Sequence, residues 1–417
     1  MFTLSLKRAL TALVALSAVT DARPPCPPRD NQEWVTVWGA MPQLTEPHNL
    51  PPAPFNETGL VFRDTTIRQT VKVSLAASTI RLQISNVFGG SDLPITAVSV
   101  ALPSDPSVAG TSGIQADTAR KVTFSNATSF VVPPGALYVI YLAAGQTTNA
   151  ITSHPGSRTS SWLAYGNHVS DAELPSPVRT DHWFLISALE ARLYKGASTF
   201  AIVGDSLTDG RGSTTNANNR WPDRLLARLQ LDPATSQVAI LNQAAGGNRV
   251  LNDGLGPAAL GRIDRDVLAH SGVRYALLFI GINDIGTTAS DEAALTLTAG
   301  RLEQAYAQMA YRIRRKGIAV WGATLTPMTG EGQTYGTPER EAARQRVNAW
   351  IRGSGVFDAV VDFDEIVRDP SAPEKLAAAY DEGDHLHLNP AGYQAMADGF
   401  DLALFTAAST GTSGWRR

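Results

Sequence analysis

The segment FAIVGDSLT, residues 200–208, joins an apolar run to a glycine turn that is followed by polar residues. A strand that runs into such a turn exposes the next side chains at the carboxyl end of a parallel sheet, where open α/β folds bind their ligands. We therefore expect Ser206 to lie at this edge of a sheet. Because a serine hydroxyl is a poor nucleophile, a catalytic role for Ser206 requires a base and a third group that orients the base.

The segment DHLH, residues 384–387, contains candidates for both of these groups. Asp384 and His387 are three residues apart, which allows the carboxylate to fix the imidazole tautomer while the other ring nitrogen faces Ser206. Acyl transfer also requires hydrogen-bond donors for the oxyanion of the transition state. Such donors are available in NQAAGGN, residues 242–248, and in GIND, residues 281–284, each of which follows a predicted strand.

These four segments, in this order, resemble the sequence blocks of the SGNH, or GDSL-type, hydrolase superfamily. The resemblance covers approximately residues 199–405 and implies an ester hydrolase. It also implies that Ser206 is the nucleophile and that Asp384 and His387 complete a catalytic triad.

The resemblance further implies three donors to the oxyanion. They are the backbone N–H of Ser206, the backbone N–H of Gly247 and the side-chain amide of Asn283. The second block contains two adjacent glycines, and only the spacing from Asn242 favours Gly247 over Gly246.

Each segment also has a purely structural interpretation. The turn at Asp205 and Ser206 is compatible with a simple strand end that caps the next helix. Asn283 and Asp284 follow an apolar strand and are typical helix-capping residues. We assign Asp284 to such a capping role and leave it out of the site.

A metal cluster is the alternative interpretation of the last segment. His385 and His387 lie near Asp381 and Asp384, and alternate residues of an extended segment point the same way. Because no third histidine segment lies nearby, we expect neither a metal nor a cofactor, and we expect His385 to pack or to face solvent. The remaining histidines, at positions 48, 154, 168, 182 and 270, have no motif around them.

The composition is that of a globular protein, with 43% hydrophobic and 18% charged residues. The formal net charge is −3, and Lys and Arg form no cluster, so we do not expect a nucleic-acid partner. A length of 417 residues is long for one domain and suits two.

The N-terminus predicts export from the cell. Residues 1–22 have a basic start, a short apolar stretch and small residues at the end, as in a secretory signal peptide. We therefore predict a secreted, extracellular protein without stable membrane insertion, since no later stretch is long and apolar enough to span a bilayer. The sequons at Asn56 and Asn126 predict glycosylation if the source is eukaryotic. The single cysteine, Cys26, has no partner for an internal disulfide.

The apolar pattern divides the rest of the chain. Between about residues 31 and 194, alternating apolar residues separated by turn-rich segments predict an all-β, jelly-roll-like sandwich. Beyond Gly196, short apolar strands alternate with helix-length segments, which predicts a flavodoxin-like α/β/α parallel sheet. Strands are predicted at 199–204, 238–242, 274–281, 318–324 and 359–362, and helices at roughly 221–231, 256–270, 291–316, 338–352 and 391–405. The predicted boundaries are 23–195 for the β-sandwich domain, 196–408 for the catalytic domain and 409–417 for a disordered tail.

This two-part arrangement resembles a subgroup of secreted SGNH esterases that includes xylan-associated acylesterases. The resemblance implies a carbohydrate esterase that removes short acyl groups, most simply acetyl, from plant cell-wall carbohydrate. Arg249, next to the oxyanion glycine, is a candidate for binding sugar hydroxyls or a carboxylate, unless it only pairs with a surface acid. Residues 244–249 are small or polar and predict no groove for a long acyl chain.

Two other functions remain open from the sequence. A lipolytic or aryl esterase is one alternative, because the same superfamily includes both and fold does not determine substrate. The other is a non-catalytic carbohydrate-binding protein, in which tryptophans of the β-rich half stack against sugar rings. The candidates are Trp34, Trp38, Trp162 and Trp183, although aromatic residues in a sandwich more often belong to the core.

Overall fold

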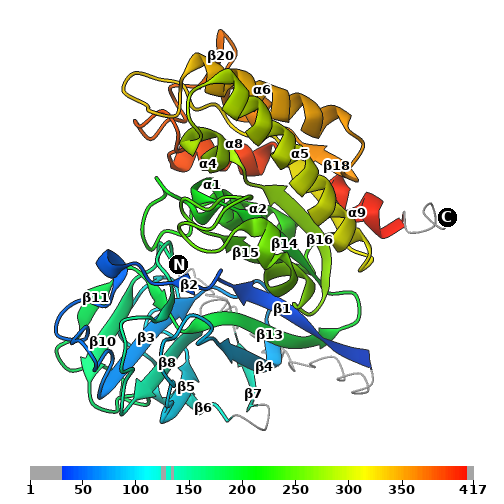
Figure 1. The fold of residues 1–417 in the computed structure, drawn as a ribbon. Helices are drawn as coiled ribbons and strands as arrows, with labels where there is room; N and C mark the ends of the chain where they lie inside the picture. Colours follow the sequence, from blue (N-terminus) through cyan, green and yellow to red (C-terminus); the bar gives the residue numbers. More distant parts are fainter. Residues whose placement is uncertain (1–30, 124–127, 133–135, 411–417) are drawn as a thin grey trace, which may run out of the picture.

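The computed structural model describes residues 31–123, 128–132 and 136–410, and it consists of an antiparallel and a parallel half (Figure 1). The predicted signal peptide, Cys26, Asn126 and residues 411–417 of the predicted tail lie outside the described residues. Within the described residues, no helix has the length and apolar character needed to cross a membrane. Asn56 is exposed in a turn.

The antiparallel half contains three sheets. The first has the order β1 (Gln32–Gly39), β13 (Ile186–Tyr194), β4 (Ala77–Ile84) and β7 (Thr128–Val132). The second has the order β11 (Val178–Thr180), β10 (Ser161–Tyr165), β3 (Thr65–Val71), β8 (Ala136–Leu142), β5 (Ala97–Ala101) and β6 (Arg120–Lys121). The third has the order β12 (Trp183–Phe184), β9 (Thr152–His154) and β2 (Gln43–Leu44). Short 3-10 turns, η2 (Pro47–Asn49) and η3 (Ala116–Thr118), lie between strands. The β-rich half that the alternating pattern predicts is confirmed.

The core of this half lies between the sheets. Ile67, Ile140, Leu163 and Leu189 are completely buried, as expected for inward-facing residues of alternating strands. The same cluster includes Ala239, which belongs to the parallel half. The two halves therefore share part of their apolar core.

The second half is a parallel sheet with the order β15 (Val238–Ala244), β14 (Ser198–Gly204), β16 (Val273–Phe279), β17 (Ala319–Ala323) and β18 (Ala359–Val361). This is the 2-1-3-4-5 order of flavodoxin-like folds, as predicted. β14 is buried along its whole length, which explains the apolar run at residues 200–203. A small hairpin, β19 (Arg368–Asp369) and β20 (Ala372–Leu376), lies outside this sheet.

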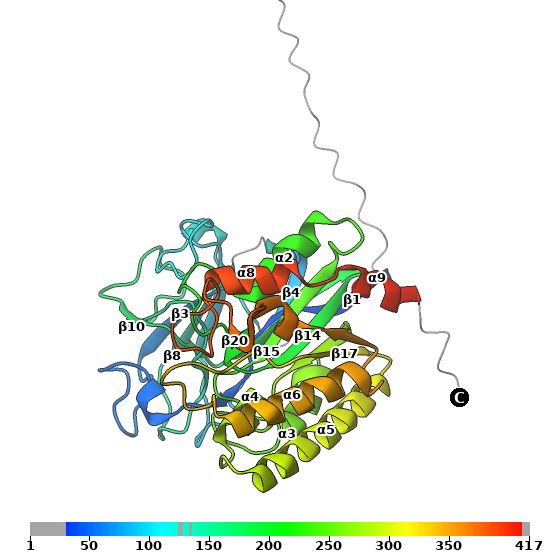
Figure 2. The same cartoon turned by 90° about the horizontal axis from the view of Figure 1, so that it is seen from above.

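Helices cover both faces of the parallel sheet. Figure 2 shows α2 and α8 on one side, and α3, α5 and α6 on the other. The described helices are α1 (Ser206–Asp209), α2 (Trp221–Leu231), α3 (Ala259–Ile263), the π-helical turn η4 (Asp264–Leu268), α4 (Ile282–Thr287), α5 (Glu292–Arg314), α6 (Pro338–Gly353), α7 (Phe363–Val367), α8 (Pro390–Asp398) and α9 (Ala403–Thr410).

Two predicted helices differ from the structure. The segment predicted as helix 256–270 begins only at Ala259, because the Asn248 amide donates to the carbonyls of Leu255 and Pro257 and holds this stretch outside the helix. The segment predicted as helix 391–405 is broken between α8 and α9. The break allows Phe400 and Phe405, with ring centroids 5.9 Å apart, to enter the same aromatic cluster under the sheet.

The antiparallel half covers the outer edge of the parallel sheet. Ser74 bonds the edge strand β15, since its Oγ accepts from the Ile240 N–H at 3.1 Å and donates to the Ile240 carbonyl at 3.4 Å. Thr199 of β14 donates through Oγ1 to the Thr36 carbonyl of β1 at 2.8 Å. Figure 1 shows β1 beside β15 at this boundary. Edge-strand groups that would otherwise be unpaired are thus satisfied by the β-rich half.

Candidate active site

The ends of three neighbouring strands bring the predicted segments together. Gly204 of β14 is in register with Ala244 of β15 and with Phe279 of β16. Parallel strands end at the same edge of a sheet, so the loops that carry Ser206, Gly247 and Asn283 leave the sheet side by side. This is the edge at which the sequence predicts Ser206.

Ser206 is the first residue of the short helix α1. Asp205 is its N-cap, and the Asp205 carboxylate accepts from the Leu207 N–H at 3.1 Å. Ser206 is 9% exposed. The serine hydroxyl therefore sits at a capped helix start, on the surface side of a buried strand.

His387 lies next to Ser206, as the resemblance implies, and Asp384 lies next to His387, as their spacing predicts. The Oγ of Ser206 is 2.8 Å from Nε2 of His387, and Nδ1 of His387 is 2.6 Å from Oδ2 of Asp384. The second carboxylate oxygen of Asp384 accepts from the backbone N–H of Leu386 at 3.0 Å and of His387 at 2.7 Å. Asn389 caps α8 directly after this segment, with Pro390 in the first turn, and so fixes where the loop ends.

Burial and neighbouring charges set the ionisation of this pair. Burial lowers the pKa of His387, and the positive charge of Arg211 lowers it further, while Asp384 and Glu382 act in the opposite direction. Burial alone would raise the pKa of Asp384, but the hydrogen bonds from the His387 side chain and backbone outweigh it and lower this pKa. At neutral pH, the arrangement is an ionised carboxylate beside a neutral imidazole, which is the state that a general base requires.

The structure distinguishes the two adjacent glycines after β15. The Gly246 N–H donates to Oδ2 of Asp209 at 2.9 Å and is therefore occupied. Gly247 has a φ of +70°, and its N–H has no hydrogen-bond partner within the described part of the chain. Of the two glycines, only Gly247 offers a free backbone donor, in agreement with the spacing from Asn242.

The Asn283 side chain is held by two partners. Its Nδ2 donates to the Asn248 carbonyl at 3.0 Å, and its Oδ1 accepts from the Tyr335 hydroxyl at 3.2 Å. A carbonyl oxygen can only accept, so the contact with Asn248 fixes which end of the amide carries the nitrogen. The second hydrogen of Nδ2 remains available for a ligand.

Asp284 does not cap its own helix, so the predicted capping role is wrong. Its carboxylate instead accepts from the backbone N–H groups of Val250 and Leu251, at 2.8 and 2.9 Å. The physical reason is that α4 follows a sharp turn at Gly281, which points Asp284 back toward the preceding loop. Asp284 thus fastens the loop that carries Gly247.

Arg249 does not form the surface ion pair that was its alternative role, and its binding of substrate stays a prediction. Its guanidinium donates to the backbone carbonyl of Asp253 within its own loop. No carboxylate within the described residues forms an ion pair with Arg249. The exposed side chain of Leu255 lies next to Gly247, since its Cδ1 would be 2.5 Å from a Cβ on Gly247.

Two residues of the loop between β17 and α6 were missed by the sequence analysis. Tyr335 contacts Asn283, and Gln333 donates through Nε2 to the Asp384 carbonyl at 2.6 Å. The Tyr335 N–H also donates to Oε1 of Gln333 at 3.0 Å. One loop therefore links the predicted oxyanion amide to the acid of the triad, and no motif in the sequence indicates this link.

His385 lies outside the site. Its Nδ1 is 2.6 Å from Asp381, and its backbone has a φ of +60°. The left-handed backbone at His385 interrupts the extended conformation that the metal interpretation assumes, and the two rings bond different carboxylates, Asp381 and Asp384. Among the described residues, no group of three or more His, Cys, Asp or Glu side chains is arranged to hold a metal ion.

The four candidate tryptophans do not form a shared stacking surface. Trp38 and Trp183 are buried against each other, with ring centroids 5.0 Å apart. The Trp162 indole donates to the Gly110 carbonyl, and the Trp34 ring is covered by the Arg81 guanidinium.

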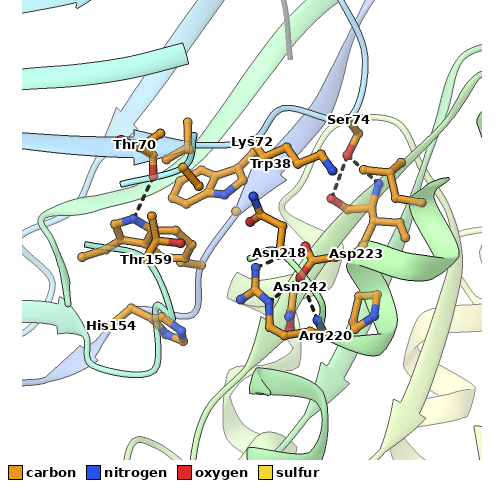
Figure 3. Close-up of a pocket in the computed structure, with 18 of the residues that line it drawn as sticks. Trp38, Thr70, Lys72, Ser74, His154, Thr159, Asn218, Arg220, Asp223 and Asn242 are labelled. Atoms are coloured by element: carbon orange, nitrogen blue, oxygen red, sulfur yellow. Dashed lines mark hydrogen bonds and ion pairs between the residues drawn. The ribbon is translucent and has the colours of Figure 1, made fainter. Parts of the chain in front are cut away.

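A cavity of about 240 Å³ lies between the two halves. Trp38, Thr70 and His154 line it from the β-rich half, and Arg220 and Asn242 line it from the parallel half (Figure 3). It does not include Ser206 or His387. The cavity and the Ser206 site are therefore separate.

One family model matches a segment within the parallel half. The sequence model of the GDSL-like Lipase/Acylhydrolase family matches residues 202–395. These residues include Ser206, Gly247, Asn283, Asp384 and His387. No curated protein matches the chain.

Solved structures resemble about half of the chain. A lipolytic protein of the G-D-S-L family from Desulfitobacterium hafniense is 19% identical, covers 48% of this chain and 97% of its own, and has a TM-score of 0.36. A GDSL-like lipase from Bacteroides thetaiotaomicron is 18% identical, with 51% and 88% coverage and a TM-score of 0.36. An acetylxylan esterase from Geobacillus stearothermophilus is 18% identical, with 49% and 94% coverage and a TM-score of 0.36.

Proposed function

Because residues 202–395 form a GDSL-like acylhydrolase domain and the protein is an ester hydrolase, we propose that it is a secreted serine esterase that uses Ser206, His387 and Asp384. The observation that carries this proposal is the continuous contact from Ser206 Oγ through both ring nitrogens of His387 to Asp384, at 2.8 and 2.6 Å. This contact joins a serine hydroxyl to a base and an orienting carboxylate at the edge of the sheet.

The proposed reaction follows the acyl-enzyme route. Ser206 Oγ attacks the ester carbonyl while Nε2 of His387 accepts the hydroxyl proton, and Asp384 holds the ring in the correct tautomer. His387 then gives the proton to the leaving alcohol. A water molecule, deprotonated by His387 in turn, hydrolyses the acyl-serine and releases the acid.

The negative charge that develops on the carbonyl oxygen meets three proposed donors. These are the N–H groups of Ser206 and Gly247 and the Nδ2 of Asn283, each fixed before substrate binds. Donors held in place in this way need no reorganisation during the reaction, which is why removing one typically costs about 10²–10³ in kcat.

The proposed substrates are short acyl esters, most simply acetyl esters of plant cell-wall carbohydrate. Residues 244–247 carry no bulky side chain next to the proposed oxyanion site, and this small loop supports a short acyl group. Secretion fits a polymeric substrate outside the cell and remains a proposal based on residues 1–22.

A lipolytic activity on longer chains is the second candidate, and one observation favours it. Leu255 is 47% exposed and packs over Gly247, so it supplies apolar surface where the sequence predicts none. If an acyl chain lies on Leu255, a Leu255→Ser variant loses activity on octanoyl esters and keeps it on acetyl esters. If Leu255→Ser and the wild-type enzyme have equal rates on octanoyl esters, this candidate loses its basis.

The decisive experiment compares Ser206→Ala with the wild-type enzyme on p-nitrophenyl acetate, butyrate and octanoate and on acetylated xylan. We expect Ser206→Ala to abolish turnover with an unchanged circular dichroism spectrum, and an organophosphorus ester to label Ser206 alone. We also expect kcat/KM to fall from acetate to octanoate. Retained activity in Ser206→Ala rejects the nucleophile, and a preference for octanoate without release of acetate from xylan assigns the lipolytic class.

A further inference from the structure

One histidine of the β-rich half reaches the loop that follows Ser206. His154 ends strand β9 and is 3% exposed. Its Nε2 lies 2.9 Å from Oδ1 of Asp209, the last residue of α1, and its Nδ1 lies 3.0 Å from the Met41 carbonyl. Figure 3 shows the His154 ring at the border of the cavity between the halves.

The partners of the His154 ring determine where its protons lie. The Met41 carbonyl only accepts, so Nδ1 carries a hydrogen. Nε2 lies 2.9 Å from a carboxylate oxygen of Asp209, so the two side chains are within hydrogen-bond distance. Both side chains of this contact are buried, so no solvent competes for it and it holds the Asp209 carboxylate in one place.

The other oxygen of Asp209 holds the oxyanion loop. Oδ2 accepts from the Gly246 N–H at 2.9 Å. Gly246 precedes Gly247, whose φ is +70°. Two consecutive glycines leave the backbone unusually free to rotate. The bond to the Gly246 N–H therefore restricts the direction in which the Gly247 N–H points.

The backbone at Gly156 lies tightly against the Asp209 carboxylate. A Cβ added to Gly156 would lie 1.7 Å from Oδ2 of Asp209. Any side chain at position 156 must therefore displace the Asp209 carboxylate. His154 and Gly156 together confine Asp209 from the side of the β-rich half.

We propose that His154 and Asp209 are positioning residues for the oxyanion loop, so that the β-rich half supplies part of the catalytic arrangement of the esterase. The chain of contacts runs from the Met41 carbonyl through His154 and Asp209 to Gly246, and ends one residue before the proposed donor Gly247. The proposal rests on the proposed role of Gly247. Neither residue touches the substrate.

Two substitutions at position 154 separate the parts of this contact. Asn places its amide near the position of Nδ1 and retains a donor for Met41, but it is too short to reach Asp209. Gln places its amide near the position of Nε2 and retains a donor for Asp209. Gly156→Ala is an independent variant, which leaves His154 intact and displaces Asp209 by contact.

The experiment measures kcat and KM on p-nitrophenyl acetate, with the active fraction counted by titration with an organophosphorus ester. We expect His154→Asn and Gly156→Ala to lower kcat per active site by about 10- to 100-fold, somewhat less than the 10²–10³ lost with a whole donor. KM should change less than twofold, because the loop holds the transition state. His154→Gln should recover most of kcat.

The matched control is His168→Asn, because His168 forms a similar pair with Asp171 at 2.6 Å within the β-rich half. It should retain wild-type kcat. The proposal is overturned if His154→Asn keeps wild-type kcat per active site. This includes the case in which the substitution only lowers the fraction of titratable enzyme, as the loss of a merely structural pair would. Activity in Ser206→Ala would reject the proposed esterase mechanism itself. Wild-type kcat in His154→Asn, with Ser206→Ala inactive, would reject only the positioning role.

Discussion

At the scale of single residues, the environment of His387 determines the pH at which the proposed base works. Burial lowers its pKa from the ordinary 6.5, and the cation of Arg211 adds to this effect. A base with a lowered pKa is neutral, and therefore active, at lower pH.

We predict that the acid limb of the kcat/KM profile has its midpoint below 6.5 and that Arg211→Gln moves this midpoint upward. Removing the cation removes one cause of the lowered pKa, so the imidazolium persists to higher pH. The measurement is the pH profile on p-nitrophenyl acetate, with Lys316→Gln as a control that removes an exposed charge at the far end of α5. A midpoint that stays in place or falls in Arg211→Gln contradicts the assignment.

Asp205, next to the nucleophile, has the opposite type of shift. Burial raises its pKa to about 7, the nearby carboxylates of Asp284 and Asp209 add to this, and the hydrogen bond from the Leu207 N–H opposes it. In the unfolded chain, the same carboxyl ionises near pH 4. Between these two values the unfolded state releases a proton that the folded state keeps, so the folded state loses stability as the pH rises.

We therefore predict that Asp205→Asn gains stability relative to wild type as the pH rises from about 4 to 7, and that the gain is constant above this range. Asn keeps the cap on Leu207 without the ionisation. The gain should be on the order of a few kcal/mol, since one pKa unit corresponds to about 1.4 kcal/mol. The measurement is urea unfolding at several pH values. Asp401→Asn is the control, because Asp401 accepts from the Ala403 N–H in the same geometry at an exposed position. A gain that does not vary with pH would be inconsistent with this cause.

At the scale of elements, the loop between β17 and α6 supports both sides of the site. Tyr335 holds the Asn283 amide, and Gln333 holds the loop of Asp384. A long loop that makes such contacts acts as part of the active site, although its sequence contains no chemical motif.

We predict that Tyr335→Phe lowers kcat on p-nitrophenyl acetate by roughly 5-fold with little change in KM, because one neutral hydrogen bond contributes about 1 kcal/mol. The ring is kept, so only the bond to Asn283 Oδ1 is lost. Tyr311→Phe, at an exposed position of α5, is the control and should match the wild type. An increase in KM at constant kcat would mean that Tyr335 binds substrate instead.

At the scale of the whole molecule, the two halves depend on each other. Ser74 satisfies both backbone groups of Ile240 on the edge strand β15, and Ala239 packs into the core of the β-rich half. Without the β-rich half, this edge would expose unpaired backbone groups and apolar surface, a combination that favours aggregation.

We predict that residues 196–417 expressed alone are insoluble or inactive, and that co-expression with residues 31–195 restores part of the activity. The cut falls between β13 and β14, where the chain crosses from one half to the other. The measurement is esterase activity in the soluble fraction, normalised by active-site titration. A soluble fragment with wild-type kcat would show that the β-rich half is dispensable.

Periodicity was sufficient to predict most of the fold, and the resemblance of four sequence blocks to the SGNH superfamily predicted the pairing of Ser206 with the distant His387 and Asp384. The signals for the strands, the glycine turn and the Asp384–His387 contact are local, because each depends on neighbouring residues. The same local signals failed for the segment around Gly399, where aromatic packing broke a predicted helix, and for Asp284, which bonds a preceding loop.

Only the tertiary structure decided which glycine of the pair keeps a free N–H, which residue orients Asn283, and what holds Asp209. The partners are Asp209 for Gly246, Tyr335 for Asn283 and His154 for Asp209, each far along the chain from the group it bonds. A hydrogen bond between distant segments depends on how strands and loops pack, and no pattern of neighbouring residues records it. For this reason no motif surrounds His154, although the Asp209 carboxylate that it contacts also accepts from the proposed oxyanion loop.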